Sequence, residues 1–131
     1  MTRRLRALSL VILATLALVG ATADAQPTGD KPRCFRSSDW RGWKATPDVR
    51  AIYIRVGSRR IYRVDFAHAC TALRRGSHLF NRVRGSGSIC SAIDLNLRVS
   101  VGGGMSTPCI ASKLTELTPE ETAALPKGLR P

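Results

Sequence analysis

Two histidines, His68 and His78, are the side chains best suited to acid and base chemistry near neutral pH. Two imidazoles and a cation can hydrolyse a phosphodiester, and Arg74, Arg75 and Lys113 would supply the cation. This combination defines one hypothesis, a small secreted hydrolase of the ribonuclease type. Both histidines lie in a stretch with weak apolar patterning, where a solvated surface histidine is the ordinary case. We therefore favour a protein that is not an enzyme and assign no catalytic residues.

Four cysteines carry a second kind of chemistry, and their spacing favours disulfide bonds over metal binding. They lie 36, 20 and 19 residues apart, at Cys34, Cys70, Cys90 and Cys109. Zinc sites and thioredoxin-type motifs need two cysteines on one short turn, so the sequence indicates no metal site. The glycines at 102–104 lack the Lys and Ser/Thr of a phosphate loop, so no cofactor is indicated. Of the three possible pairings, we expect Cys70 with Cys90 and Cys34 with Cys109.

The first 25 residues have the three parts of an export signal. Arginines at positions 3, 4 and 6 precede an uncharged apolar stretch, residues 7–20, and small residues at 23 and 25 suit a signal peptidase. A membrane-spanning helix needs about 20 apolar residues, more than this stretch offers. We expect cleavage after Ala25, a disordered leader over 26–33, and a periplasmic protein that does not span the membrane, with secretion beyond the outer membrane left open.

The charge of the chain indicates which partners it could attract. The 131 residues carry a formal net charge of +12, and removal of residues 1–25 takes away three arginines and one aspartate, which leaves +10. Such a charge attracts polyanions over long distances, which in a cell envelope means an acidic polymer or anionic lipid headgroups. An exported protein rarely meets nucleic acid, so we do not expect nucleic acid as its partner. The alternative is an alkaline protein whose charge serves only solubility.

Residues 51–66 have the clearest strand pattern. Apolar residues alternate with polar ones on both sides of Gly57–Arg59, which is typical of a half-buried hairpin. A three-residue turn sets Ile54 opposite Tyr62, whereas a two-residue turn would place an arginine on the core face. We expect the three-residue turn, with a mixed outer face. The candidate anion-binding residues are four arginines of this hairpin: Arg55, Arg59, Arg60 and Arg63.

The other elements are shorter. We expect one strand and a turn within 34–50, where two tryptophans pack against the core, a helical turn around Cys70 that ends at Gly76, and a strand over 79–84. The alternation of residues 93–101 predicts the strongest strand, and a last strand follows near 109–114, with Ile110 and Leu114 inward. The sequence Thr118–Glu121 is typical of a capping box, so a short helix should begin there and lie across one end of the sheet.

These elements predict a mainly all-β fold, a small antiparallel barrel or sandwich of five or six strands with a short central helical turn and a short C-terminal helix. A parallel sheet would need a helix between its strands, and the sequence offers none. We expect one disulfide-linked β domain over 34–126, followed by a C-terminal tail over 127–131.

The chain resembles a family of small exported Gram-negative bacterial proteins that is catalogued only as a domain of unknown function. The likeness covers nearly all of residues 34–126, and the motifs that carry it are Cys34–Phe35, Trp43–Ala45, Pro47–Asp48, Ile52–Gly57, Tyr62–Asp65, Ile89–Cys90, Pro108–Cys109 and Leu117–Glu121. The resemblance implies envelope export and paired cysteines, and it implies no activity.

Taken together, the sequence favours a non-enzymatic exported protein that binds an anionic envelope component or a protein partner. The histidine-dependent hydrolase and a purely structural accessory without a ligand remain the alternatives. Each of these three hypotheses requires different side chains to lie together on the surface of the folded protein.

Overall fold

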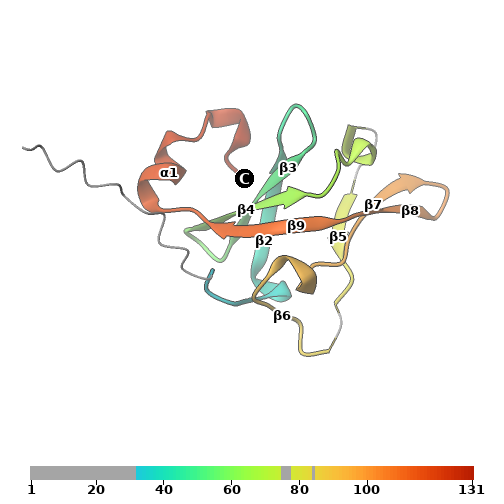
Figure 1. The fold of residues 1–131 in the computed structure, drawn as a ribbon, viewed down its shortest axis with the longest axis horizontal. Coiled ribbons are helices and arrows are strands. Elements are labelled where there is room, and N and C mark those ends of the chain that lie inside the picture. The colour runs from blue at the N-terminus through green and yellow to red at the C-terminus, as the bar shows by residue number, and fades with distance from the viewer. Residues whose placement is uncertain (1–31, 75–77, 84) are drawn as a thin grey trace, which may run out of the picture.

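The computed structural model describes residues 32–74, 78–83 and 85–131. Nine strands form three antiparallel sheets in this part of the chain (Figure 1). The larger sheet contains β2 (Trp40–Ala45), β3 (Ala51–Val56), β4 (Arg60–Phe66) and β9 (Ala111–Glu116), in that order. The smaller sheet has the order β5 (His78–Asn81), β7 (Leu97–Gly102) and β8 (Met105–Cys109). A two-stranded sheet pairs β1 (Phe35–Arg36) with β6 (Ser88–Ile89).

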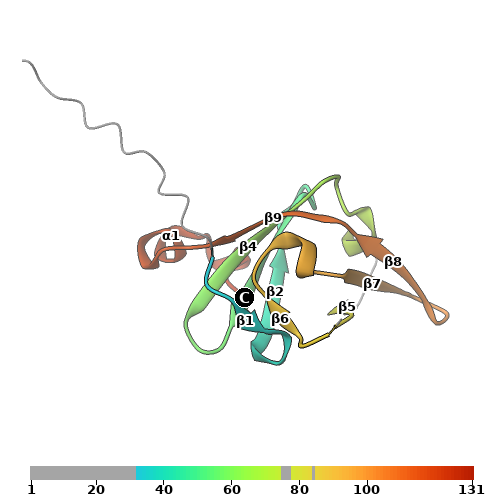
Figure 2. The ribbon, with the colours of Figure 1, turned by 60° about the horizontal axis from the view of Figure 1, so that its bottom comes forward.

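The predicted all-β class is confirmed, with more and shorter strands than the five or six expected. The sheets form no closed barrel over the described ranges, and the arrangement fits a sandwich. Only Ile110 separates β8 from β9, so the chain passes directly from the smaller sheet into the larger one (Figure 2). The core between the sheets includes Phe35, Ile52, Ile54, Val56, Tyr62, Val64, Ile89, Leu97, Val99 and Leu114.

The hairpin of β3 and β4 has the predicted register. Ile54 lies opposite Tyr62, Ile52 opposite Val64, and Val56 opposite Arg60, which leaves three residues in the turn. Gly57 adopts a φ of 62° there, in the left-handed region that glycine enters at little cost. The side chains at Ile52 and Ile54 are fully buried, as the alternation requires.

The strand predicted over 93–101 is wrong in its first part. Residues Ala92–Asp94 form a 3-10 turn, η3, and Ile93 is 90% exposed. The Asp94 carboxylate accepts hydrogen bonds from the backbone N–H groups of Cys90 and Ser91, each at 2.9 Å. This local bonding competes with strand pairing, and it prevails here over the apolar alternation. Ile110, also expected inside, is 64% exposed, because it occupies the corner between β8 and β9.

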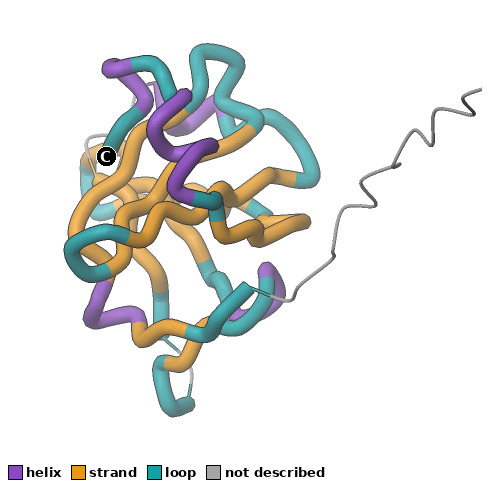
Figure 3. The backbone as a smooth tube through the Cα atoms, turned by 90° about the vertical axis from the view of Figure 1, so that its left-hand side faces the viewer, coloured by secondary structure: helices purple, strands orange, loops and turns teal. Residues whose placement is uncertain are grey.

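The C-terminal helix, α1 (Pro119–Ala124), begins with the predicted capping box. The Glu121 N–H donates to Thr118 Oγ1 at 3.2 Å, and the Thr118 N–H donates to Glu121 Oε2 at 2.8 Å. The helix follows β9 closely, and Figures 1 and 2 show it beside that end of the larger sheet, as predicted. Its residue Glu121 also borders a groove on the outer face of the sheet, and Figure 3, which looks from that end, shows the helix in front of the strands. Beyond α1, a 3-10 turn, η4 (Lys127–Leu129), contacts β2.

Helical structure near Cys70 is confirmed as a 3-10 turn, η2 (Thr71–Arg74). A further 3-10 turn, η1 (Ser37–Asp39), links β1 to β2. The predicted end of the helical turn at Gly76, the end of the next strand at Arg84, the signal over 1–25 and most of the leader lie outside the described residues.

Two disulfide bonds are present, as predicted, but the expected pairing is wrong. Cys34 is joined to Cys90, and Cys70 to Cys109. Cys34 precedes β1 and Cys90 follows β6, so the pairing of these two strands brings the cysteines together, with Cα atoms 4.2 Å apart. Neither two-residue strand has an alternation that the sequence could reveal. Cys70 and Cys109 are buried, whereas Cys34 is exposed.

Candidate anion-binding surface

Two of the candidate arginines are exposed to solvent at the turn end of the β3–β4 hairpin. Arg55 extends from the outer face of β3, opposite Ile61 of β4, and Arg59 lies in the turn itself. Both side chains are exposed, and neither forms an ion pair with a described carboxylate. The Gly57 N–H in the turn donates a hydrogen bond to the carbonyl oxygen of Asp39 at 2.8 Å.

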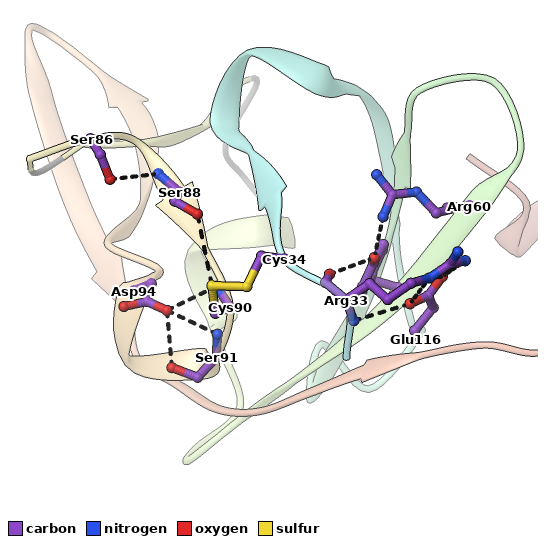
Figure 4. The surroundings of a disulfide bond; sticks show 10 residues. Arg33, Cys34, Arg60, Ser86, Ser88, Cys90, Ser91, Asp94 and Glu116 are labelled. Carbon is purple, nitrogen blue, oxygen red and sulfur yellow. Dashed lines mark hydrogen bonds and ion pairs between the residues drawn. A yellow bond between two sulfur atoms is a disulfide. The ribbon is translucent and has the colours of Figure 1, made fainter. Parts of the chain in front are cut away.

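Arg60 points to the opposite face of the hairpin. Its Nη1 donates to the Tyr62 hydroxyl at 2.9 Å, and its guanidinium carbon lies 5.7 Å from the centroid of that ring. The Tyr62 hydroxyl donates in turn to the carbonyl oxygen of Arg33 at 2.8 Å. These contacts fix the direction of the guanidinium but bring no negative charge to it (Figure 4).

Glu116, at the end of β9, is the carboxylate nearest to this cluster. It is bound by Arg33, whose Nη2 lies 2.6 Å from Glu116 Oε1. The hydrogen bond from Arg33 is the main cause that holds the pKa of Glu116 below its ordinary value of 4.5, and burial opposes it. Burial is the main cause that raises the pKa of Tyr62, so this hydroxyl stays neutral at physiological pH. Arg60 therefore contacts a neutral hydroxyl and forms no ion pair with Glu116.

Arg63 is already neutralised. Its Nη2 and Nε both lie 2.8 Å from Asp65 Oδ1, and its Nη1 donates to the Tyr53 hydroxyl at 3.2 Å. The guanidinium also lies 5.8 Å from the Tyr53 ring centroid. The hydrogen bond to Asp65 raises the pKa of Arg63 further. Of the four candidates, Arg55, Arg59 and Arg60 therefore remain without a carboxylate partner among the described residues, and we call these three the hairpin arginines.

The register of the sheet also places two lysines on the outer face, outside the hairpin turn. Lys44 lies opposite Tyr53, and Lys113 lies opposite Asp65, both on the outer face of the larger sheet. Lys113 borders a groove of about 470 Å³ between this face and α1. The groove is lined by Tyr53, Arg63, Asp65, Lys113, Thr115, Leu117, Glu121 and Leu125. The outward position of Lys113 follows from the pairing of β9 with β4. These strands are distant in the sequence, so no local pattern could predict it.

The outer face of the larger sheet is less exposed to solvent than the mixed surface that the sequence predicted. Tyr53 and Ile61 are 7% and 5% exposed, because the segment after β9 covers the sheet there. The C-terminal residue also lies on this face, since its carbonyl carbon is 4.0 Å from where a Cβ of Gly42 would be. Arg55 at the hairpin end, Lys44 and Lys113 stay exposed on this face.

The two histidines are not brought together by any contact of the described residues. His68 lies in the loop after β4, and His78 begins β5 in the other sheet, opposite Ser100. Both are exposed, and neither side chain has a hydrogen-bond partner within the described ranges. The same ranges contain no group of three or more His, Cys, Asp or Glu residues placed to hold a metal ion.

Over the part of the chain that the structure describes, no helix has the length and apolar character needed to cross a bilayer. The resemblance to exported bacterial proteins of unknown function stays a prediction. No family model matches the chain, and no curated protein or solved structure is significantly similar to it.

Proposed function

We propose that this chain is a non-enzymatic periplasmic β domain that binds phosphate groups of an anionic envelope component through its hairpin arginines. The observation that carries the proposal is the presence of Arg55, Arg59 and Arg60, with no carboxylate partner among the described residues, around one short turn. Guanidinium groups present planar donor pairs that match phosphate oxygens, and they remain charged at any physiological pH.

The rigidity of the hairpin supports binding. The turn joins two strands in the middle of the larger sheet, and both strands are buried along their core face. A ligand would therefore meet arginines whose backbone is already ordered, which lowers the entropy cost of binding. The two disulfides support an exported domain, because such bonds persist in oxidising compartments.

The test compares two double variants of equal net charge. Arg55→Thr with Arg59→Ser removes two hairpin arginines, whereas Lys113→Thr with Lys127→Ser removes two charges elsewhere, each pair from one strand and one turn. Binding is measured to phosphatidylglycerol vesicles, to phosphatidylcholine vesicles and to soluble polyphosphate. The two phosphate sources separate a headgroup surface from a free polymer.

We expect the hairpin variant to lose affinity for the phosphate ligands and the lysine variant to keep it. For polyphosphate, the slope of log affinity against log salt should become shallower by about one for each contact removed. Equal losses of affinity in both variants would show that only net charge matters. They would favour the hypothesis of a structural accessory without a ligand.

A further inference from the structure

Two strand edges face each other across an open gap in the sandwich. β2 pairs only with β3 and β5 only with β7, so each has one edge without a strand partner among the described residues. A cavity of about 310 Å³ lies between them, and its lining includes Trp40 and Trp43 from β2 and Leu79 and Phe80 from β5. We call this gap the β2–β5 seam.

Hydrogen-bond alternation shows which backbone groups face the seam. The Thr46 N–H donates to the Ala51 carbonyl at 2.9 Å, so residues 46, 44 and 42 bond toward β3. The N–H and C=O groups of Trp43 and Ala45 therefore point away from β3. These groups offer the donors and acceptors that an added strand requires.

The side chains around the seam give it an apolar floor. Phe80 is 39% exposed, and Trp40, Trp43 and Leu79 are half-buried against the core. One end of the seam is bridged by Asn81, whose Nδ2 lies 3.5 Å from Ser37 Oγ and whose Oδ1 accepts from the Asn96 N–H at 2.7 Å. An apolar side chain of an incoming segment could rest on the aromatic rings.

The two strands that border the seam carry basic residues and no acidic ones. Arg41 and Lys44 belong to β2, and Arg82 follows β5, whereas residues 40–45 and 78–83 contain no Asp or Glu. The negative groups closest in the chain or in space are Asp39, which precedes β2, and the C-terminal carboxylate, whose carbon lies 4.0 Å from where a Cβ of Gly42 would be. Arg41 also lines the cavity itself. An acidic segment would be attracted to these flanks, and a basic one would be repelled.

We propose that the β2–β5 seam binds an extended acidic peptide segment of a partner protein, which pairs with the free edge of β2 as an added strand. Main-chain hydrogen bonds to Trp43 and Ala45 supply the pairing. Alternate apolar side chains of the segment contact Trp43 and Phe80, and its carboxylates face Arg41. This inference does not depend on the hairpin arginines.

The chain carries its own probe of the seam, because Trp40 and Trp43 are its only tryptophans. A capped octapeptide of alternating Glu and Val should shift the tryptophan fluorescence to shorter wavelength in a saturable way. It should also slow hydrogen exchange at the Trp43 and Ala45 amides. An octapeptide of alternating Lys and Val should bind more than about tenfold less tightly, because its charges meet arginine and lysine.

Three controls make the test decisive. The Glu/Val peptide N-methylated at every residue keeps its charge but loses the strand donors of both edges, so it should not bind. Arg41→Ser should weaken binding, and Arg74→Ser, which removes an exposed charge that does not line the cavity of the seam, should not. The variant Arg55→Thr with Arg59→Ser should bind the peptide normally. Equal binding of the N-methylated peptide, or no protection at Trp43 and Ala45 at saturation, would overturn the proposal, whether or not the hairpin binds phosphate.

Discussion

The two disulfides should contribute unequally to stability, and their burial, not their loop length, should decide the order. The bridges span 56 and 39 residues. In the chain-entropy description, closing either loop stabilises the folded state by about 4 kcal/mol, and the two values differ by only about 0.3 kcal/mol. A larger difference between them must therefore come from the folded state.

The folded state distinguishes the bridges clearly. Cys70 and Cys109 are buried in the core cluster, while Cys34 is exposed beside β1. Replacing two buried sulfur atoms by hydrogen removes apolar contacts worth about 0.8 kcal/mol each, as for a methylene group. We expect Cys70→Ala with Cys109→Ala to cost about 1.5 kcal/mol more than Cys34→Ala with Cys90→Ala.

Urea titration of the two double variants and the parent measures these costs. A second measurement applies even where a variant fails to fold: mild reduction of the parent protein with iodoacetamide present should alkylate Cys34 and Cys90 first, as mass spectrometry of the fragments would show. Equal costs, a larger cost for Cys34 and Cys90, or first alkylation at Cys70 would refute this reasoning.

Three further predictions concern single side chains. Thr118→Ala removes the cap of α1 and should cost about 1 kcal/mol in urea titration, whereas Thr118→Ser should cost much less. Replacing His68 and His78 by Gln should change stability by less than about 0.5 kcal/mol and leave any cellular phenotype intact; a phenotype lost without unfolding would favour the hydrolase. Because the folded-state pKa of Glu116 is lowered, its contribution is complete above the unfolded-state pKa and is lost as the pH falls through the folded-state value. Glu116→Gln should therefore flatten the acid side of the stability profile, followed by urea titrations from about pH 6 to pH 3, and an unchanged profile would contradict the Arg33 contact.

Local patterns predicted the parts of the fold that depend on neighbouring residues. The hairpin register followed from apolar residues that must share one face, and the start of α1 followed from Thr118 and Glu121. The pairing of β1 with β6 had no such signal, because each strand has two residues and they lie about fifty positions apart. The disulfide pairing depends on those strands, so the sequence could not determine it.

The candidate surface was predictable only in part for the same reason. Alternation placed Arg55 and Arg63 on one face, and the structure agrees. The neutralisation of Arg63 depends on Asp65, which lies two residues away on the same strand and therefore on the same face. The cover over Tyr53 and Ile61 depends on where α1 and the residues after it return to the sheet, which a distant contact determines.

The position of β9 as the last strand of the larger sheet has a consequence for how the protein is made. Its partner β4 is synthesised early, and the paired residues lie between 45 and 54 positions apart. Until residue 116 has emerged into the compartment where the chain folds, β4 has one edge without a partner, and Leu114 cannot cover Val64. Contacts this distant in sequence slow folding, and an unpaired apolar edge favours aggregation during the delay. We therefore expect the yield of folded protein to be limited by aggregation while the larger sheet is incomplete, and not by the stability of the folded protein.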